Sequence, residues 1–305
     1  MKRSRLVMGP VLFHWDEDRK KDFYSRIADE TDVDTVHVGE VVCAKRMPFF
    51  DKHLPSVIER LQRSGKEVVL STLALVMNER EVNQIRDIAQ MPDIMIEAND
   101  ISVVRLLAGQ PHMIGPYINT YNEGTLSYFA EKGAKRIALP WELPMSSIAA
   151  LCGAQTAAEI EVQVFGRMPL AISARCYSAR AQGLHKDGCR YVCGDHLDGM
   201  DVETLDDTPF LAVNGLQTLS SHYVEMADNI AQMQTAGVTA FRLSPHSLDM
   251  TRVSDLYRQV LARKTDPEEL RHRLKEMRFP MNFANGFLHE APGAEFRQTR
   301  ARQAE

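Results

Sequence analysis

One unit recurs along the chain and restricts the fold more than any other feature. A short apolar run is followed by a polar stretch, an amphipathic helical pattern and a glycine, and then the next apolar run begins. Alternating strands and helices are typical of a parallel sheet, either doubly wound or closed into a barrel. The runs expected as strands cover residues 7–13, 35–38, 68–71, 94–96, 113–118, 136–139, 162–165 and 241–243. Eight strands favour an α/β fold of the TIM-like (β/α)8 barrel type.

Helix signals separate these runs. Leu54, Val57 and Leu61 share one face of a predicted helix, and Gly65 is placed to end it. Asn99 or Asp100 is placed to cap another helix, and Asp266 followed by proline marks a third helix start. The spacing therefore supports strands and helices in strict alternation.

Polar residues stand at or just after many of the expected strand ends. In a barrel, the carboxyl ends of the strands share one rim, and active-site residues gather there. Loops are polar in any case, so a single such residue carries little weight, and it is the recurrence that favours a site. The pocket candidates are Glu40, Glu97, Asn119, Asn214 and Arg242.

The stretch 174–209 is poor in large aliphatic residues and contains three of the five cysteines, spaced C-x12-C-x3-C. A loop this long inside a compact domain is usually functional or disordered. Cys43 follows the second expected strand and Cys176 the seventh, so both should lie on the same rim. Cys152 lies in a small apolar helical pattern, where cysteine commonly serves as core filler. The candidate metal ligands are therefore Cys43, Cys176, Cys189 and Cys193.

Four thiolates suit either structural zinc or an iron–sulfur cluster. Zinc sites usually use paired C-x2-4-C knuckles, and only Cys189 and Cys193 form such a pair. The scattered spacing favours a cluster over zinc without deciding between them. His185 and His196 flank these cysteines and are alternative ligands, although loop histidines are more often solvated.

Composition and charge restrict which partners and which cellular compartment we expect for the protein. With 36 basic and 41 acidic residues, the formal charge of −5 disfavours nucleic-acid binding. The apolar start is interrupted by Gly9-Pro10, so it predicts a first strand and not a signal peptide, and no run predicts a membrane span. An odd number of cysteines indicates a reducing cytoplasm. We expect one barrel-like domain over 1–305, a cysteine-bearing insertion over 174–209 after about the seventh strand, and a mobile tail over 293–305.

Several runs of residues resemble a known family. These are Gly39-Glu-Val-Val-Cys-Ala-Lys-Arg, Val69-Leu-Ser-Thr-Leu-Ala-Leu-Val, Leu170-Ala-Ile-Ser-Ala-Arg-Cys and Val213-Asn-Gly-Leu-Gln-Thr. With the order of the cysteines, they are similar to the anaerobic ubiquinone-biosynthesis branch of the collagenase-like peptidase family. The resemblance extends from residue 9 to about residue 250.

The resemblance implies a [4Fe–4S] cluster on Cys43, Cys176, Cys189 and Cys193. It also implies a heterodimer with a UbiU-like sister subunit and a nearby UbiT-like lipid-binding protein. Such a complex supports O2-independent hydroxylation of the ubiquinone ring. Other readings are a collagenase-like peptidase, an RNA-modifying hydroxylase, and a non-catalytic subunit stabilised by its cluster. Lys45, Arg46 and Arg175 would place positive charge near the thiolates, unless they are ordinary surface side chains.

Overall fold

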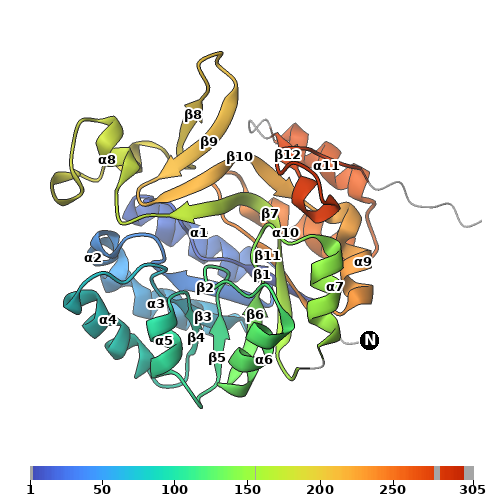
Figure 1. Cartoon of the computed structure of the whole chain (residues 1–305), viewed down its shortest axis with the longest axis horizontal. Coiled ribbons are helices and arrows are strands. Elements are labelled where there is room, and N and C mark those ends of the chain that lie inside the picture. Colours follow the sequence, from blue (N-terminus) through green and yellow to red (C-terminus); the bar gives the residue numbers. More distant parts are fainter. Residues whose placement is uncertain (1–2, 155, 278–281, 299–305) are drawn as a thin grey trace, which may run out of the picture.

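The computed structural model describes residues 3–154, 156–277 and 282–298. Its centre is a ring of parallel strands, in which each strand pairs with the next and the last pairs with both β7 and β1. This pairing closes the sheet, so the expected (β/α)8 barrel is confirmed (Figure 1). The barrel strands are β1 (Arg5–Met8), β2 (Thr35–Gly39), β3 (Glu67–Ser71), β4 (Met95–Ala98), β5 (His112–Ile114), β6 (Ala134–Ala138), β7 (Glu159–Ile172) and β11 (Ala240–Leu243).

Helices surround the barrel, and several begin at an acidic or amide side chain that accepts a hydrogen bond from the first turn. Asp16, Asn78 and Asn122 do this, as does Asp100, one of the two caps expected from the sequence. The helices are α1 (Glu17–Glu30), α2 (Met47–Phe50), α3 (Leu54–Arg63), α4 (Glu79–Ala89), α5 (Ile101–Leu106), α6 (Glu123–Glu131), α7 (Met145–Gly153), α9 (Ile230–Ala236), α10 (Met250–Leu261) and α11 (Pro267–Glu276). Within the described ranges, no helix combines the length and the apolar character that crossing a bilayer requires.

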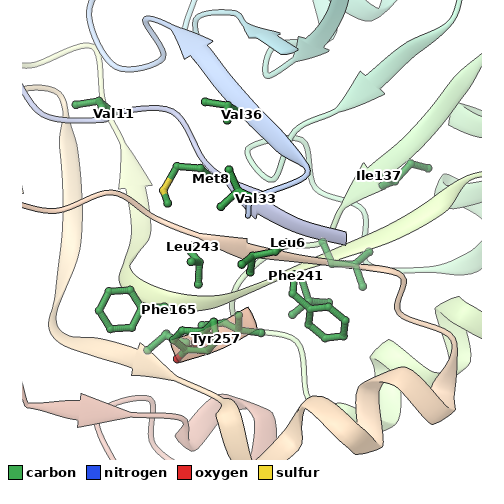
Figure 2. Packing of buried hydrophobic residues seen from close by; sticks show 14 of the residues in the cluster. Leu6, Met8, Val11, Val33, Val36, Ile137, Phe165, Phe241, Leu243 and Tyr257 are labelled. Atoms are coloured by element: carbon green, nitrogen blue, oxygen red, sulfur yellow. Dashed lines mark hydrogen bonds between the residues drawn. The ribbon is translucent and has the colours of Figure 1, made fainter. Parts of the chain in front are cut away.

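The main hydrophobic core lies between the strands and the helices. Figure 2 shows Leu6, Phe241 and Leu243 of the barrel strands close to Phe165 and to Tyr257 of α10. Successive residues of a strand point to opposite faces, so the alternate positions of the same strands face the barrel interior. Parallel strands that are buried on both faces explain the uninterrupted apolar runs in the sequence.

The barrel interior is polar. Arg242 of β11 forms ion pairs with Glu161 of the adjacent β7 and with Glu97 of β4. Strands β11 and β4 are not neighbours in the ring, so the second ion pair must cross the interior. Arg136 of β6 likewise reaches Glu67 of β3, with 3.0 Å between nitrogen and oxygen. Paired charges therefore fill much of the barrel centre.

The insertion after the seventh barrel strand is confirmed, and it contains strands that the sequence did not predict. After α8 (Tyr177–Ala181), the chain forms β8 (Met200–Glu203), β9 (Pro209–Asn214) and β10 (Gln217–Glu225), which extend β7 as an antiparallel sheet. Strand β8 is the exposed edge of this sheet and has only four residues, none of them fully buried, so its alternation is too short to stand out in the sequence. The β8–β9 hairpin projects at the top of Figure 1, beside α8.

Near the C-terminus, the short strand β12 (Phe283–Ala284) pairs with β10. The expected mobile tail began at residue 293. The main chain of Arg297 exchanges two hydrogen bonds with the Asn285 side chain, which ties residues up to 297 to the body of the protein. Residues 299–305 of that expected tail lie outside the described residues.

Candidate metal centre

Two of the four cysteines are placed directly by barrel strands. Cys43 lies four residues beyond the carboxyl end of β2, and Cys176 lies four residues beyond that of β7. The two strands run parallel in one ring, so their carboxyl ends open onto the same mouth of the barrel. Cys43 and Cys176 therefore belong to one rim although they are far apart in the sequence.

The other two cysteines come from the loop between α8 and β8. Cys189 and Cys193 line one small cavity together with Cys43 and Cys176. The structure thus brings all four expected ligands to one place. Neither His185 nor His196 lines this cavity. Cys152 lies away from it on α7, packed against the main core.

The cysteine loop is fastened to the barrel at two points. The Asp198 carboxylate binds Ser247 and lies 3.2 Å from Nδ1 of His246. His246 is buried and lies three residues beyond the end of β11. Trp15 Nε1 donates to the carbonyl of Leu197 at 2.8 Å. These contacts connect residues more than forty positions apart, and nothing in the sequence pattern predicts them.

An aromatic group holds the middle of the same loop. Tyr191 packs edge-on against Phe49, with 4.7 Å between ring centroids, and lies 5.6 Å from the His14 ring. Arg190 and Tyr191 both adopt positive φ, which is costly for residues with a side chain. The backbone between Cys189 and Cys193 is therefore held in a conformation that local preference alone would not select.

Arg46 forms the inner wall of the cysteine cavity. Its side chain is 3% exposed and donates to the carbonyl of Leu12 and to Oδ1 of Asn214, both at 2.9 Å. The nearest carboxylate, that of Glu40, is 4.0 Å away and already accepts the backbone N–H groups of Val42 and Cys43. The Nε atom of Arg46 has no partner among the described residues. Arg46 is thus a buried cation with little negative charge from the chain to balance it.

The surroundings of the thiols are largely apolar. A small hydrophobic cluster that includes Leu12, Val41 and Leu216 packs around Cys176 and is separate from the main core. Burial raises the pKa of the Cys43 thiol, while the charge of Arg46 acts in the opposite direction. Burial also raises the pKa of Cys176. Although burial lowers it, the pKa of Arg46 is raised overall, chiefly by the charge of Cys193 and Glu40.

The five pocket candidates have different environments. Glu40 and Asn214 both contact Arg46, so they lie beside the cysteine cavity. Glu97 and Arg242 are paired with each other inside the barrel, where the charge of Arg242 holds the pKa of Glu97 well below its usual range despite burial. Asn119 is exposed on a loop. Of the flanking basic residues, Arg46 is buried, Lys45 binds the Asp187 carboxylate at 3.0 Å, and Arg175 is exposed.

The donor set fits a thiolate-bound inorganic cofactor. It consists of four cysteine sulfurs around one cavity, with a buried guanidinium whose Nε is unpaired. Across the described residues, no three histidine, cysteine or acidic side chains converge as closely as a single metal ion requires. The four cysteines therefore share a cavity and do not form a preassembled single-ion site.

The fold and this cavity define a TIM-type barrel that carries a cysteine-lined site at the carboxyl mouth of its strands. The family model named Peptidase family U32 matches residues 21–298, which is most of the chain. The protein therefore belongs to peptidase family U32.

Several solved structures can be superposed on most of this chain. A DAHP synthase from Thermotoga maritima is 11% identical, with 91% of this chain and 69% of that chain covered and a TM-score of 0.42. The tryptophan synthase alpha subunit from Campylobacter jejuni is 10% identical, with 88% and 96% covered and a TM-score of 0.41. At this level of similarity, we carry nothing of their chemistry over to this chain.

Proposed function

We propose that Cys43, Cys176, Cys189 and Cys193 hold a [4Fe–4S] cluster, and that the chain is a UbiV-like subunit of a complex for O2-independent hydroxylation in ubiquinone biosynthesis. The observation that carries the proposal is the shared cavity. Cysteines from three separated segments line it, and a buried arginine without a full counter-ion closes it. The sequence runs around Cys43 and Cys176 supply the link to the ubiquinone branch of the family.

Charge balance supports an anionic occupant of the cavity. Removing an ion from water is costly unless an opposite charge accompanies it. The positive charge of Arg46 faces Cys43 and Cys193, whose thiolates would balance it once a metal cofactor has displaced their protons. A cluster held by four thiolates carries net negative charge and so fits beside this guanidinium.

A bound cluster would supply one-electron transfer at the mouth of the barrel. The residues of the chain have separate tasks around it. The cysteines hold it, and Arg46 favours the more negative, reduced form. The Glu40 carboxylate fixes the backbone that carries Cys43. Leu12, Val41 and Leu216 keep water from the thiol side of the cavity.

The remaining parts of the proposal concern partners. By resemblance, a UbiU-like sister subunit forms a heterodimer with this chain, and a UbiT-like lipid-binding protein is a further partner. Copurification from anaerobically grown cells tests both. A chain that purifies without either protein under these conditions contradicts this part of the proposal.

Anaerobic purification tests the cofactor itself. We expect a broad brown absorbance and about four irons per chain, the content of one [4Fe–4S] centre. Changing any of the four cysteines to alanine should remove the absorbance. Cys152→Ala is the matched control, because Cys152 is partly buried but does not line the cavity, and it should keep the colour. A colourless protein loaded with zinc would contradict the cluster.

The role of the cluster is tested separately with Cys176→Ala. Loss of ubiquinone synthesis with the heterodimer intact supports electron transfer. Loss of the heterodimer supports a structural role for the cluster.

The family name also raises the alternative of a collagenase-like peptidase. Cleavage of gelatin by purified protein that survives removal of the iron would favour that alternative over the proposal.

A further inference from the structure

A second cavity lies outside the barrel wall, between the carboxyl ends of β2 and β3 and the helices α2, α3 and α4. We call it the α3–α4 cavity. Its volume is about 230 Å³, somewhat below the roughly 300–1,000 Å³ of most small-molecule sites, so it suits a small ligand. Most of its wall is apolar, formed by Leu54, Leu70, Leu73, Ile85, Ile88 and Met91. An apolar ligand body would be accommodated here.

Lys20 lines this cavity and is unusual for a lysine. It is 6% exposed and shares the buried stripe of α1 with Tyr24 and Ile27. Its ammonium lies 4.7 Å from the centre of the Phe50 ring. Within the described part of the chain, no hydrogen bond or ion pair reaches that ammonium. Lysines are almost never this buried without a partner.

The other charges around Lys20 do not satisfy it. Oε1 of Glu40 accepts the N–H groups of Val42 and Cys43 and lies 4.0 Å from Arg46, and no ion pair among the described residues joins Glu40 to Lys20. Asp51 and Asp87 also line the cavity, but both are exposed at its rim. Burial lowers the pKa of Lys20; the charge of Glu40 offsets part of this effect, and the charge of Arg46 adds to it. Two buried cations, Lys20 and Arg46, and one buried carboxylate, Glu40, therefore line the cavity.

A second polar group in the cavity is also unpaired. The side-chain oxygen Oε1 of Gln84, on α4, is buried and has no hydrogen-bond partner among the described residues. A buried acceptor that is left unpaired costs about 1–3 kcal/mol. A ligand with a hydroxyl or N–H group would recover that cost.

We propose that the α3–α4 cavity binds a small molecule with an apolar body and one acidic group, and that the acidic group pairs with Lys20. A hydroxyl or N–H group elsewhere on the molecule donates to Gln84. The proposal does not depend on a cluster, because none of the four cysteines lines this cavity. The two sites do share Arg46, which lines both cavities.

Isothermal titration calorimetry of the full-length protein tests the proposal with two probes of the same shape. One is the acid 1-naphthylacetate, and the other is the neutral 2-(1-naphthyl)ethanol. We expect saturable one-to-one binding of the acid, at least about tenfold tighter than the alcohol, which corresponds to about 1.4 kcal/mol. No saturable binding of the acid, or equal affinity for both probes, would overturn the proposal.

Three variants locate the bound acid. Lys20→Met should weaken binding of the acid about tenfold or more and change binding of the alcohol little. Lys21→Met is the matched control, since Lys21 is the neighbouring lysine on the same helix, with its side chain 40% exposed, and it should leave both affinities unchanged. Ile88→Trp fills the cavity from α4 and should abolish binding of both probes. Unchanged binding in Lys20→Met or in Ile88→Trp would place the probe elsewhere and refute the assignment.

Discussion

Arg242 and Arg46 are almost equally buried, at 4% and 3% exposed, but their surroundings differ. Arg242 lies in the barrel interior, and carboxylates of β4 and β7 pair with it directly. Arg46 lies at the barrel mouth, where it binds a carbonyl and an amide oxygen and faces the thiols. The first region pairs its buried cation with two carboxylates, whereas in the second the one nearby carboxylate, that of Glu40, lies 4.0 Å from the guanidinium. We assign the paired arginine to the scaffold and the less completely paired one to the proposed site.

The largest effect that would test this contrast comes from Arg242→Met. The change leaves Glu97 and Glu161 buried without their main partner, and removing one partner of a buried pair typically costs about 3–5 kcal/mol. Urea unfolding of the cofactor-free protein measures this loss. Arg273→Met, which removes an exposed pair with Glu269 on α11, should cost about 0.5 kcal/mol or less. A cost below about 1 kcal/mol for Arg242→Met would contradict the proposed difference between Arg242 and Arg46.

The Glu225→Gln variant tests a buried carboxyl group whose pKa is raised, whereas that of Glu97 is lowered. Burial raises the pKa of Glu225 to about 7, despite its contact with Arg271. The folded protein therefore holds this proton more tightly than the unfolded chain, so the group stabilises the fold below pH 4.5. That stability is lost as the pH rises to about 7. The loss is on the order of 3 kcal/mol, since each pKa unit corresponds to about 1.4 kcal/mol.

Unfolding free energies measured between pH 4.5 and 8 check this expectation. Glu225→Gln should remove most of the decline. Glu97 provides the comparison, because its depressed pKa has the opposite consequence: its stabilisation is present above pH 4.5 and is lost as the pH falls through the folded value. An identical pH profile in the Glu225→Gln variant would contradict the raised pKa.

Arg46→Met should have an intermediate effect on stability and a specific effect on the cofactor. In the cofactor-free protein, it leaves Asn214 Oδ1 without its donor, at a cost of about 1–3 kcal/mol, whereas the Leu12 carbonyl keeps the hydrogen bond from Asn214 Nδ2. In the loaded protein, removing the positive charge should make the reduction potential more negative. Urea unfolding and anaerobic redox titration measure the two effects. Arg175→Met, which changes an exposed arginine beside Cys176, should alter the potential less; an equal shift would mean that burial of Arg46 has no special effect.

The smallest effect is expected from Lys20→Met. This change removes a buried ammonium that has no ion-pair partner, and the lost contact with Phe50 offsets part of the gain. We expect the free energy of unfolding to rise by about 1 kcal/mol or less, measured by urea unfolding without ligand. A decrease of more than about 1 kcal/mol would show that the chain already satisfies Lys20.

The barrel strands show how much of the fold the sequence pattern predicts. All eight expected runs overlap barrel strands, although the first strand ends at Met8 and not at residue 13. The alternation was readable because each parallel strand is buried on both faces, whichever strand lies beside it. Strands β8 to β10 were not expected, because β8 and the start of β9 are exposed and polar residues such as Gln217 and Ser220 interrupt the apolar pattern of the largely buried β10. Lys20 had a readable signal, a charged residue on the apolar stripe of α1, and it was overlooked.

The sequence by itself determined the order of the eight barrel strands and the helices between them, the helix caps at Asp100 and Asp266, and the set of cysteines that follow strands β2 and β7. These depend on interactions within a few residues, which local spacing records. Only the tertiary structure decided that Glu97 and Arg242 pair inside the barrel, that Asn119 is exposed, and that Arg46 and Lys20 are buried without full counter-ions. The partner of a buried charge depends on which strands and helices meet across the fold, and no local pattern contains that information.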